Sequence, residues 1–208
     1  AWMHCGMIRI NGEKMSKSLN NFFTIRDVLA KYHPEVVRYL LVSSHYRSSI
    51  NYSEDNLKDA KAALDRFYNA LKGLPKVAPA GGEAFVERFT QVMNDDFGTP
   101  EACAVLFEMV REINRLHETD LQAAAGLAAR LKQLADVLGV LQLEADDFLQ
   151  AGAEGKVDAA QVQALIDARL AARAGKDWAE SDRIRDQLAA MGVVLEDSKG
   201  GTTWRLAD

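Results

Sequence analysis

Two lysines, two serines and two asparagines stand within the ten-residue stretch GEKMSKSLNN, at residues 12–21. Lys14 and Lys17 lie three positions apart, and Ser16 and Ser18 place hydroxyl groups beside them. A lysine ammonium is a compact charge on a flexible stem, so it can follow a phosphate chain whose charge shifts during a reaction. Losing one such electrostatic contact costs roughly 2.7–4 kcal/mol. The stretch is therefore a candidate site for nucleotide phosphates, and the alternative is a solvated turn that carries two lysines.

The composition indicates an ordinary globular protein. The 208 residues are 48% hydrophobic and 26% charged, as in soluble domains. The sequence lacks an apolar run of membrane-spanning length, and its first residues lack the pattern of a signal peptide, so we expect a cytoplasmic protein. Cys5 and Cys103 lie far apart without CxxC spacing, which indicates free thiols in a reducing compartment.

Charge is unevenly distributed along the chain. Residues 1–73 carry 11 Lys and Arg against 7 Asp and Glu, whereas residues 74–155 carry 6 against 14. If the protein binds a polyanion, contact should come from local basic clusters, and the acidic middle should mostly face away from phosphate.

The pattern of the first 52 residues predicts a strand end at 7–10, followed by a tight turn at Asn11-Gly12. A capping pattern at Thr24 and Asp27 and a proline at Pro34 then predict two short helices, at 24–32 and 34–43.

Helical periodicity dominates the rest of the chain. It predicts an antiparallel bundle of four helices between residues 53 and 139, interrupted by a Pro- and Gly-rich linker at 74–82. After a second joint at 149–160, helices at 159–174 and 177–191 and two strands around a Gly-rich turn form a small α+β module. The predicted fold is mainly α, with three parts at 1–52, 53–148 and 156–208.

Several motifs together closely resemble the cysteinyl-tRNA synthetase family of class I aminoacyl-tRNA synthetases. The motif KMSKS at 14–18 resembles a signature of the class, and four longer stretches narrow the family: WMHCGMIRINGEKMSKSLNNFFTIRDVL, VRYLLVSSHYRSSINYSEDNL, MNDDFGTPEA and MGVVLEDSKGGTTWR. The resemblance implies activation of cysteine by ATP with Mg²⁺, followed by transfer of cysteine to its tRNA. It also implies that Lys17 holds ATP phosphates and that Lys14, Ser16 and Ser18 support the loop.

Two positions depart from the family pattern. Asn20 stands where glycine is usual, but asparagine tolerates left-handed backbone. Cys5 stands where serine or asparagine is more usual, and its neighbour His4 should point to the opposite face, which argues against a shared metal.

Two features of the complete enzymes of this family are missing from the sequence. We find neither an HxGH motif in a doubly wound sheet nor a Cys, His and Glu cluster with zinc-ligand spacing. The chain is therefore expected to be a C-terminal portion of such an enzyme, without a metal site and with zinc ligands outside it. We expect a monomer.

The resemblance places tRNA recognition at two regions. In the last module Arg173, Asp182 and Asp197 fall on anticodon-reading positions. Trp178 could stack a base, although a tryptophan at helical spacing more often packs in a core. Arg183 offers similar chemistry, and Trp204 is expected to pack beneath its strand.

The second region is HYRSSINYS at 45–53, which resembles the tRNA stem-contact region, with Arg47 and His45 as candidates. Phosphate contacts from Arg26, Lys31 and Arg38 are possible but nonspecific. The acidic stretch DDFGTPEA at 95–102 resembles a metal loop only superficially, because opening a helix explains its composition.

Two other functions remain open at this level. A ligase that joins cysteine to an amino sugar would keep the lysine loop but would not need an anticodon reader. A helical interaction module would retain the signature without catalysis.

The missing nucleotide-binding motif gives a first prediction. The 208-residue chain alone should not catalyse exchange of pyrophosphate into ATP in the presence of cysteine and should not bind zinc stoichiometrically. Measurable exchange above the buffer control would contradict this expectation.

Overall fold

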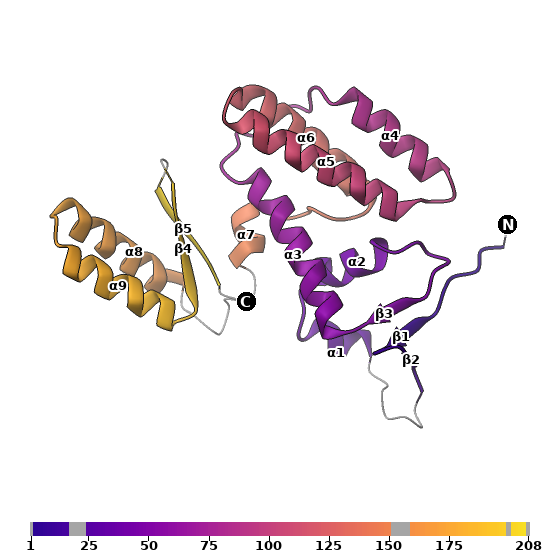
Figure 1. Ribbon diagram of the computed structural model, residues 1–208, viewed down its shortest axis with the longest axis horizontal. Coiled ribbons are helices and arrows are strands. Elements are labelled where there is room, and N and C mark those ends of the chain that lie inside the picture. Colours follow the sequence, from indigo (N-terminus) through magenta and orange to yellow (C-terminus); the bar gives the residue numbers. More distant parts are fainter. Residues whose placement is uncertain (1, 17–23, 151–158, 199–200, 207–208) are drawn as a thin grey trace. The chain divides into compact units, whose positions relative to one another are not determined.

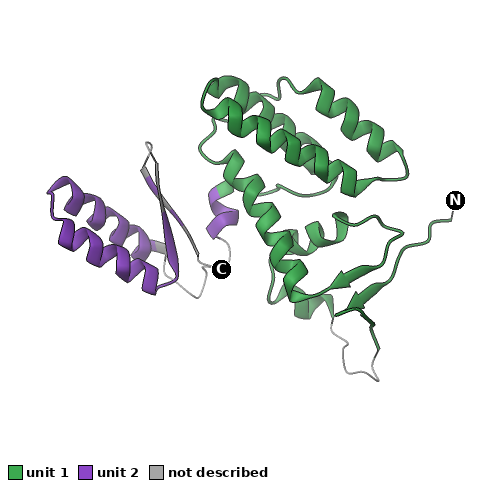
Figure 2. Cartoon of the chain, in the orientation of Figure 1, with its two compact units in different colours: residues 1–145 green, residues 146–208 purple. Residues whose placement is uncertain are grey.

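The computed structural model describes residues 2–16, 24–150, 159–198 and 201–206 and is mainly helical, as predicted. The chain divides into two compact units, residues 1–145 and 146–208 (Figure 2). The first unit holds a small sheet and the helical bundle, and the second holds the α+β module.

The small sheet contains strands β1 (Ile8–Ile10), β2 (Glu13–Lys14) and β3 (Ile50–Tyr52), in the order β2-β1-β3. Asn11 and Gly12 have φ angles of 49° and 84°, the positive values that a two-residue hairpin turn between antiparallel strands requires. The predicted strand and turn are therefore confirmed. The parallel pairing of β3 with β1 was not expected. The Gly12 N–H, in the turn after β1, donates a hydrogen bond to the side-chain oxygen of Asn51 in β3 at 2.7 Å.

Two short helices follow, α1 (Ile25–Leu29) and α2 (Pro34–Val42). Thr24 and Asp27 form the predicted capping box, and His33 caps α2 through its Nδ1. Helix α1 ends before the predicted residue 32. A residue that precedes proline disfavours helical backbone, and His33 accordingly has a ψ of 136°.

Four longer helices form the bundle: α3 (Glu54–Leu71), α4 (Glu83–Asn94), α5 (Thr99–His117) and α6 (Leu121–Val137). Helix α5 packs against α4 and α6, and α3 crosses to meet α5 and α6 (Figure 1). The predicted stops near Gly73 and Gly139 are confirmed, because both glycines adopt positive φ after a helix. The largest fully buried side chains of this unit are Leu57, Leu64, Phe67, Tyr68, Leu106, Met109, Ile113, Leu131 and Val140.

A buried carboxylate joins α2 to the bundle. Glu35 is 5% exposed, and both its oxygens lie 2.9 Å from the Tyr68 hydroxyl of α3. Glu35 Oε1 also accepts the backbone N–H of Leu141 at 2.6 Å, and the Leu143 N–H donates to the Tyr68 hydroxyl. Burial raises the pKa of Tyr68, and Glu35 adds to this, so the phenol keeps its proton and stays a donor. The network ties three distant segments together.

The second unit contains α8 (Ala159–Ala174), α9 (Trp178–Ala190) and the antiparallel pair β4 (Val193–Ser198) and β5 (Gly201–Leu206), as predicted. A short helix α7 (Ala145–Gln150) precedes them and has no predicted counterpart. Trp204 is 4% exposed, which confirms that it packs beneath its strand. The buried core comprises Val162, Ile166, Ile184, Leu188, Val193 and Trp204. Among the described helices, none is both long and apolar enough to span a membrane.

The Glu35 network predicts a large loss of stability when its carboxylate is removed. Glu35→Ala leaves the Leu141 N–H and the Tyr68 hydroxyl buried without this acceptor, so the free energy of unfolding should fall by about 2–5 kcal/mol. Urea denaturation of the chain measures this change. The control Glu87→Ala removes an exposed carboxylate of α4 and should change stability by less than about 0.5 kcal/mol. Equal effects of the two variants would contradict the assigned role.

Candidate functional site

The lysine loop begins at the end of the β1–β2 hairpin. Lys14 is the last residue of β2 and is exposed, and Arg9 of β1 stands directly opposite it in the register. Like charges that face each other across two strands repel, so this end of the hairpin favours a nearby anion. Ser16 is half-buried, whereas Lys17 and Ser18 lie outside the described residues. The structure therefore places the start of the lysine loop at the end of the β1–β2 hairpin.

A second arrangement surrounds Arg47, in the segment between α2 and β3. Asp96, from the turn between α4 and α5, contacts the side chains of three consecutive residues. Its carboxylate accepts from the Tyr46 hydroxyl at 2.7 Å and pairs with Arg47 Nη2 at 2.7 Å. Its backbone oxygen lies 3.0 Å from His45 Nε2. Residues almost fifty positions apart in the sequence thus form one cluster.

Further bonds inside the segment fix its side chains. The Arg47 Nε donates to the Tyr46 hydroxyl at 2.9 Å, and the Arg47 backbone N–H donates to His45 Nδ1 at 3.3 Å. Because Nδ1 accepts, a neutral His45 ring carries its proton on Nε2 and donates it to Asp96. The hydrogen bond to Tyr46 and then the charge of Asp96 raise the pKa of Arg47.

The Arg47 guanidinium is held and yet open to solvent. Its Cζ atom also lies 5.5 Å from the centre of the Tyr46 ring. The rings of Tyr46 and His45 lie 4.7 Å apart, centre to centre, and are tilted by 34°. The Arg47 side chain nevertheless remains 63% exposed. A fixed, exposed guanidinium suits a phosphate or a base edge, because little rotamer freedom is left to lose on binding.

Sequence reasoning missed Tyr46 and Asp96. It explained the stretch 95–102 by its role in opening a helix, and Thr99 does begin α5. The same stretch also holds the Arg47 segment, through Asp96 and through a 3.4 Å bond from the Thr99 hydroxyl to the Ser44 carbonyl. The acidic run and the HYR triplet were visible signals, but their pairing depends on tertiary structure.

A glycine permits the close approach of the N-terminal segment to this cluster. Gly6 donates its N–H to the Tyr46 carbonyl at 2.7 Å. A Cβ atom on Gly6 would lie 1.9 Å from the Ser48 carbonyl oxygen, well inside van der Waals contact. Only glycine fits at this position, and its backbone hydrogen bond holds the N-terminal segment against residues 46–48.

The remaining basic candidates of the first unit differ in environment. Arg26 and Lys31 are exposed on and just after α1. The Arg38 side chain packs on Gly139, where an added Cβ would approach Nη1 to 3.0 Å. Arg38 thus has a packing role beside the bundle in addition to its charge.

In the second unit, three candidates lie near the facing ends of α8 and α9. Arg173 stands in the last turn of α8, Trp178 begins α9 and Asp182 follows one turn later, all exposed. Trp178 is 60% exposed, so the expectation that it packs in a core is wrong. Trp178 is the first residue of α9 and is not among the buried residues of that helix, which are Ser181, Ile184 and Leu188.

Asp182 and Arg183 each pair with an oppositely charged neighbour on α9. Asp182 pairs with Arg185 at 3.1 Å, and Arg183 makes a two-pronged contact with Glu180. Asp197 is in β4 opposite Thr202, and its side chain lies outside the described residues.

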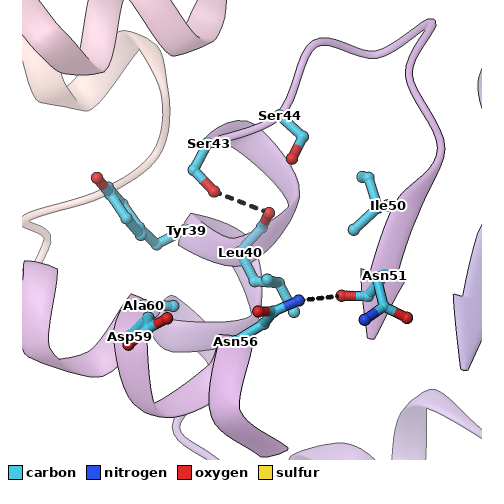
Figure 3. A pocket seen from close by; sticks show the side chains of 9 residues that line it. All are labelled: Tyr39, Leu40, Ser43, Ser44, Ile50, Asn51, Asn56, Asp59 and Ala60. Carbon is cyan, nitrogen blue, oxygen red and sulfur yellow. Dashed lines mark hydrogen bonds between the residues drawn. The ribbon is translucent and has the colours of Figure 1, made fainter. Parts of the chain in front are cut away.

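A shallow hollow lies between α2, β3 and α3 (Figure 3). Its polar groups are partly engaged inside the chain: the Ser43 hydroxyl donates to the Leu40 carbonyl, and the Asn56 amide donates to the Asn51 carbonyl. The nine lining residues are Tyr39, Leu40, Ser43, Ser44, Ile50, Asn51, Asn56, Asp59 and Ala60, none of which is a predicted site residue.

Metal ligation was tested across the part of the chain that the structure describes. Within it, no three His, Cys, Asp or Glu side chains come together as ligands. Cys103 is buried in α5, where burial raises the pKa of its thiol to about 11, and Cys5 is exposed. The described residues therefore do not fit a zinc site.

Comparison with protein families gives three matches along the chain. Residues 1–62 match the family described as the catalytic domain of class I tRNA synthetases (C). Residues 88–142 match the DALR domain, and residues 159–205 match the anticodon-binding domain of cysteinyl-tRNA ligase.

Whole-chain comparison finds close relatives. Proteins named cysteine–tRNA ligase from Pseudomonas fluorescens strains Pf0-1, Pf-5 and SBW25 are 91%, 90% and 88% identical over all 208 residues. The chain spans 45% of the length of each of these relatives.

The contact at Gly6 predicts a local weakening when a methyl group is added. Gly6→Ala forces the segment before β1 away from residues 46–48 at a cost of about 1–3 kcal/mol. Trypsin cleavage after Arg47 under native conditions should therefore be at least about fivefold faster, since cleavage follows local opening. Gly175→Ala, whose added Cβ meets its nearest atom at an ordinary 3.5 Å, is the control and should leave this cleavage unchanged. Unchanged cleavage in Gly6→Ala would refute the contact.

Proposed function

Because this chain belongs to the cysteine–tRNA ligase family, we propose that it takes part in the ATP-dependent attachment of cysteine to its tRNA. The observation that carries this proposal is 91% identity to a cysteine–tRNA ligase over every residue of the chain. The chain spans 45% of that relative's length, and we propose that it contributes to the activity of the whole enzyme.

The lysine loop would bind ATP. In this proposal Lys17 contacts the phosphates, with Mg²⁺ as the usual partner of ATP, and Lys14, Ser16 and Ser18 support the loop. The opposed cations Arg9 and Lys14 support an anion site at the base of the loop. Lysine contacts that strengthen as charge moves onto the departing pyrophosphate would accelerate formation of the adenylate.

Arg47 and His45 would contact the tRNA stem. The support comes from the exposure of the Arg47 guanidinium together with its fixed position over Tyr46. A guanidinium in this setting can donate two hydrogen bonds to one phosphate, a contact that orients an RNA without reading its sequence.

The second unit would read the anticodon through Arg173, Asp182, Asp197 and Trp178. Single-stranded bases are recognised by stacking on aromatic planes and by hydrogen bonds to their edges. The exposure of Trp178 supports a stacking role, and the match of residues 159–205 to an anticodon-binding domain supports the assignment of this unit.

In this proposal the chain acts in the cytoplasm as a monomer. Its functional divisions are the three predicted parts 1–52, 53–148 and 156–208. Zinc would be held by ligands outside this chain. The anticodon-domain match favours this ligase over one that joins cysteine to an amino sugar, which has no anticodon to read.

The proposed division of labour predicts two different mutant phenotypes. Arg47→Ala should weaken binding of cysteine-specific tRNA about equally for the natural and an altered anticodon, and should lower the salt slope by about one phosphate contact. Arg173→Ala should cost about 1–3 kcal/mol with the natural anticodon and much less with the altered one. Filter binding at several salt concentrations measures both effects.

Lys58→Ala serves as the control for charge, because Lys58 is an exposed cation of the first unit with only a 3.9 Å pair to Asp55. It should change the affinity by less than either test variant. If Arg47→Ala and Arg173→Ala showed the same dependence on the anticodon, the division of labour would be wrong.

A further inference from the structure

We propose that Asp96 is a positioning residue for RNA binding, which holds the guanidinium of Arg47 and the ring of His45 in the arrangement that meets the tRNA stem. This inference rests on the proposed role of Arg47 and adds a residue from the helical bundle to that site. Asp96 itself would not touch the RNA.

The contacts of Asp96 support a positioning role because they are directed at one short segment. One carboxylate oxygen accepts a hydrogen bond from the Tyr46 hydroxyl and the other pairs with Arg47 Nη2, both at 2.7 Å. The backbone oxygen lies 3.0 Å from His45 Nε2. The Tyr46 hydroxyl in turn accepts from Arg47 Nε, so Arg47 is held from two directions.

The backbone of the α4–α5 turn is costly, and it serves to aim this carboxylate. Asp96 and Phe97 adopt φ angles of 55° and 56°, in the left-handed region that residues with a Cβ atom disfavour. Aspartate tolerates this region better than most residues, but phenylalanine does not. Gly98 follows because a Cβ atom there would lie 2.8 Å from the Val92 carbonyl oxygen. Strain of this kind persists where the surrounding structure needs the resulting geometry.

The orientation of Arg47 also fits a ligand outside the cluster. Its side chain is 63% exposed although Nη2 and Nε are engaged. Phe97, whose ring lies 6.3 Å from that of Tyr46, is 54% exposed. A simple structural ion pair would have no need for this network of aromatic and imidazole groups around an exposed cation. A guanidinium that must meet a phosphate in one orientation would benefit from it.

The charge of Asp96 and its positioning role predict opposite effects of neutralising Asp96 on RNA binding. A carboxylate near an RNA surface repels phosphate, so its neutralisation should strengthen RNA binding if it acts only through its charge. If Asp96 orients Arg47, its neutralisation should weaken binding. Asp95 is the matched control, because it is exposed, adjacent to Asp96 and identical in charge, and its side chain makes no hydrogen bond or ion pair to the residues that the structure describes.

The experiment compares Asp96→Asn with Asp95→Asn in the 208-residue chain, using a transcript of cysteine-specific tRNA at several salt concentrations. Asparagine tolerates left-handed backbone, so the turn should persist. We expect Asp96→Asn to weaken binding about tenfold and to reduce the salt slope by about one contact, and Asp95→Asn to leave binding unchanged or slightly tighter. Asp96→Glu, which keeps the carboxylate, should bind more tightly than Asp96→Asn.

A double-mutant cycle with Arg47→Ala separates the two proposals. In the Arg47→Ala background, Asp96→Asn should weaken binding clearly less than it does in the unmodified chain, since only the His45 ring is left for Asp96 to position. If Arg47→Ala alone left binding unchanged, the proposed stem contact would fail. If Arg47→Ala weakened binding but Asp96→Asn behaved like Asp95→Asn, or weakened binding equally without Arg47, the stem contact would stand and the positioning role would be wrong.

Discussion

The packing of the first unit depends on the hydrogen bonds that the buried carboxylate of Glu35 accepts. This carboxylate accepts hydrogen bonds from the Tyr68 hydroxyl of α3 and from the Leu141 backbone, and so joins α2 to the bundle and to the segment after α6. A buried charge is costly unless its hydrogen bonds are satisfied, and these donors satisfy it only when all three segments are in place. The arrangement therefore favours one docking of α2 over others that would bury the same apolar surface.

That docking has a consequence for the Arg47 cluster. Residues 45–47 follow α2 directly, and Asp96 lies in the turn that joins two bundle helices. With α2 fixed against α3, and α3 packed against α5, the turn and the segment meet at hydrogen-bond distances. Pre-organisation of Arg47, beyond the last turn of α2, thus depends in part on a network at the first turn of the same helix.

Two carboxylates of the acidic middle of the chain pair with arginines. Asp96 belongs to this region and pairs with Arg47. Glu108 of the same region binds Arg88 through both its oxygens, between α5 and α4. Net charge over a long stretch describes the average field, whereas individual carboxylates can serve as fixed partners of cations.

The sequence by itself determined the features that depend on neighbours along the chain. Periodicity, caps and turn residues predicted the bundle helices, the strand β1 with its turn at Asn11-Gly12 and the strands of the second unit, and KMSKS together with the longer stretches around it indicated the family. Tertiary structure alone decided the parallel pairing of β3 with β1, the Glu35 network, the Asp96 contacts and the exposure of Trp178. These features join residues up to about a hundred positions apart or depend on what covers a side chain, and no local pattern encodes either property.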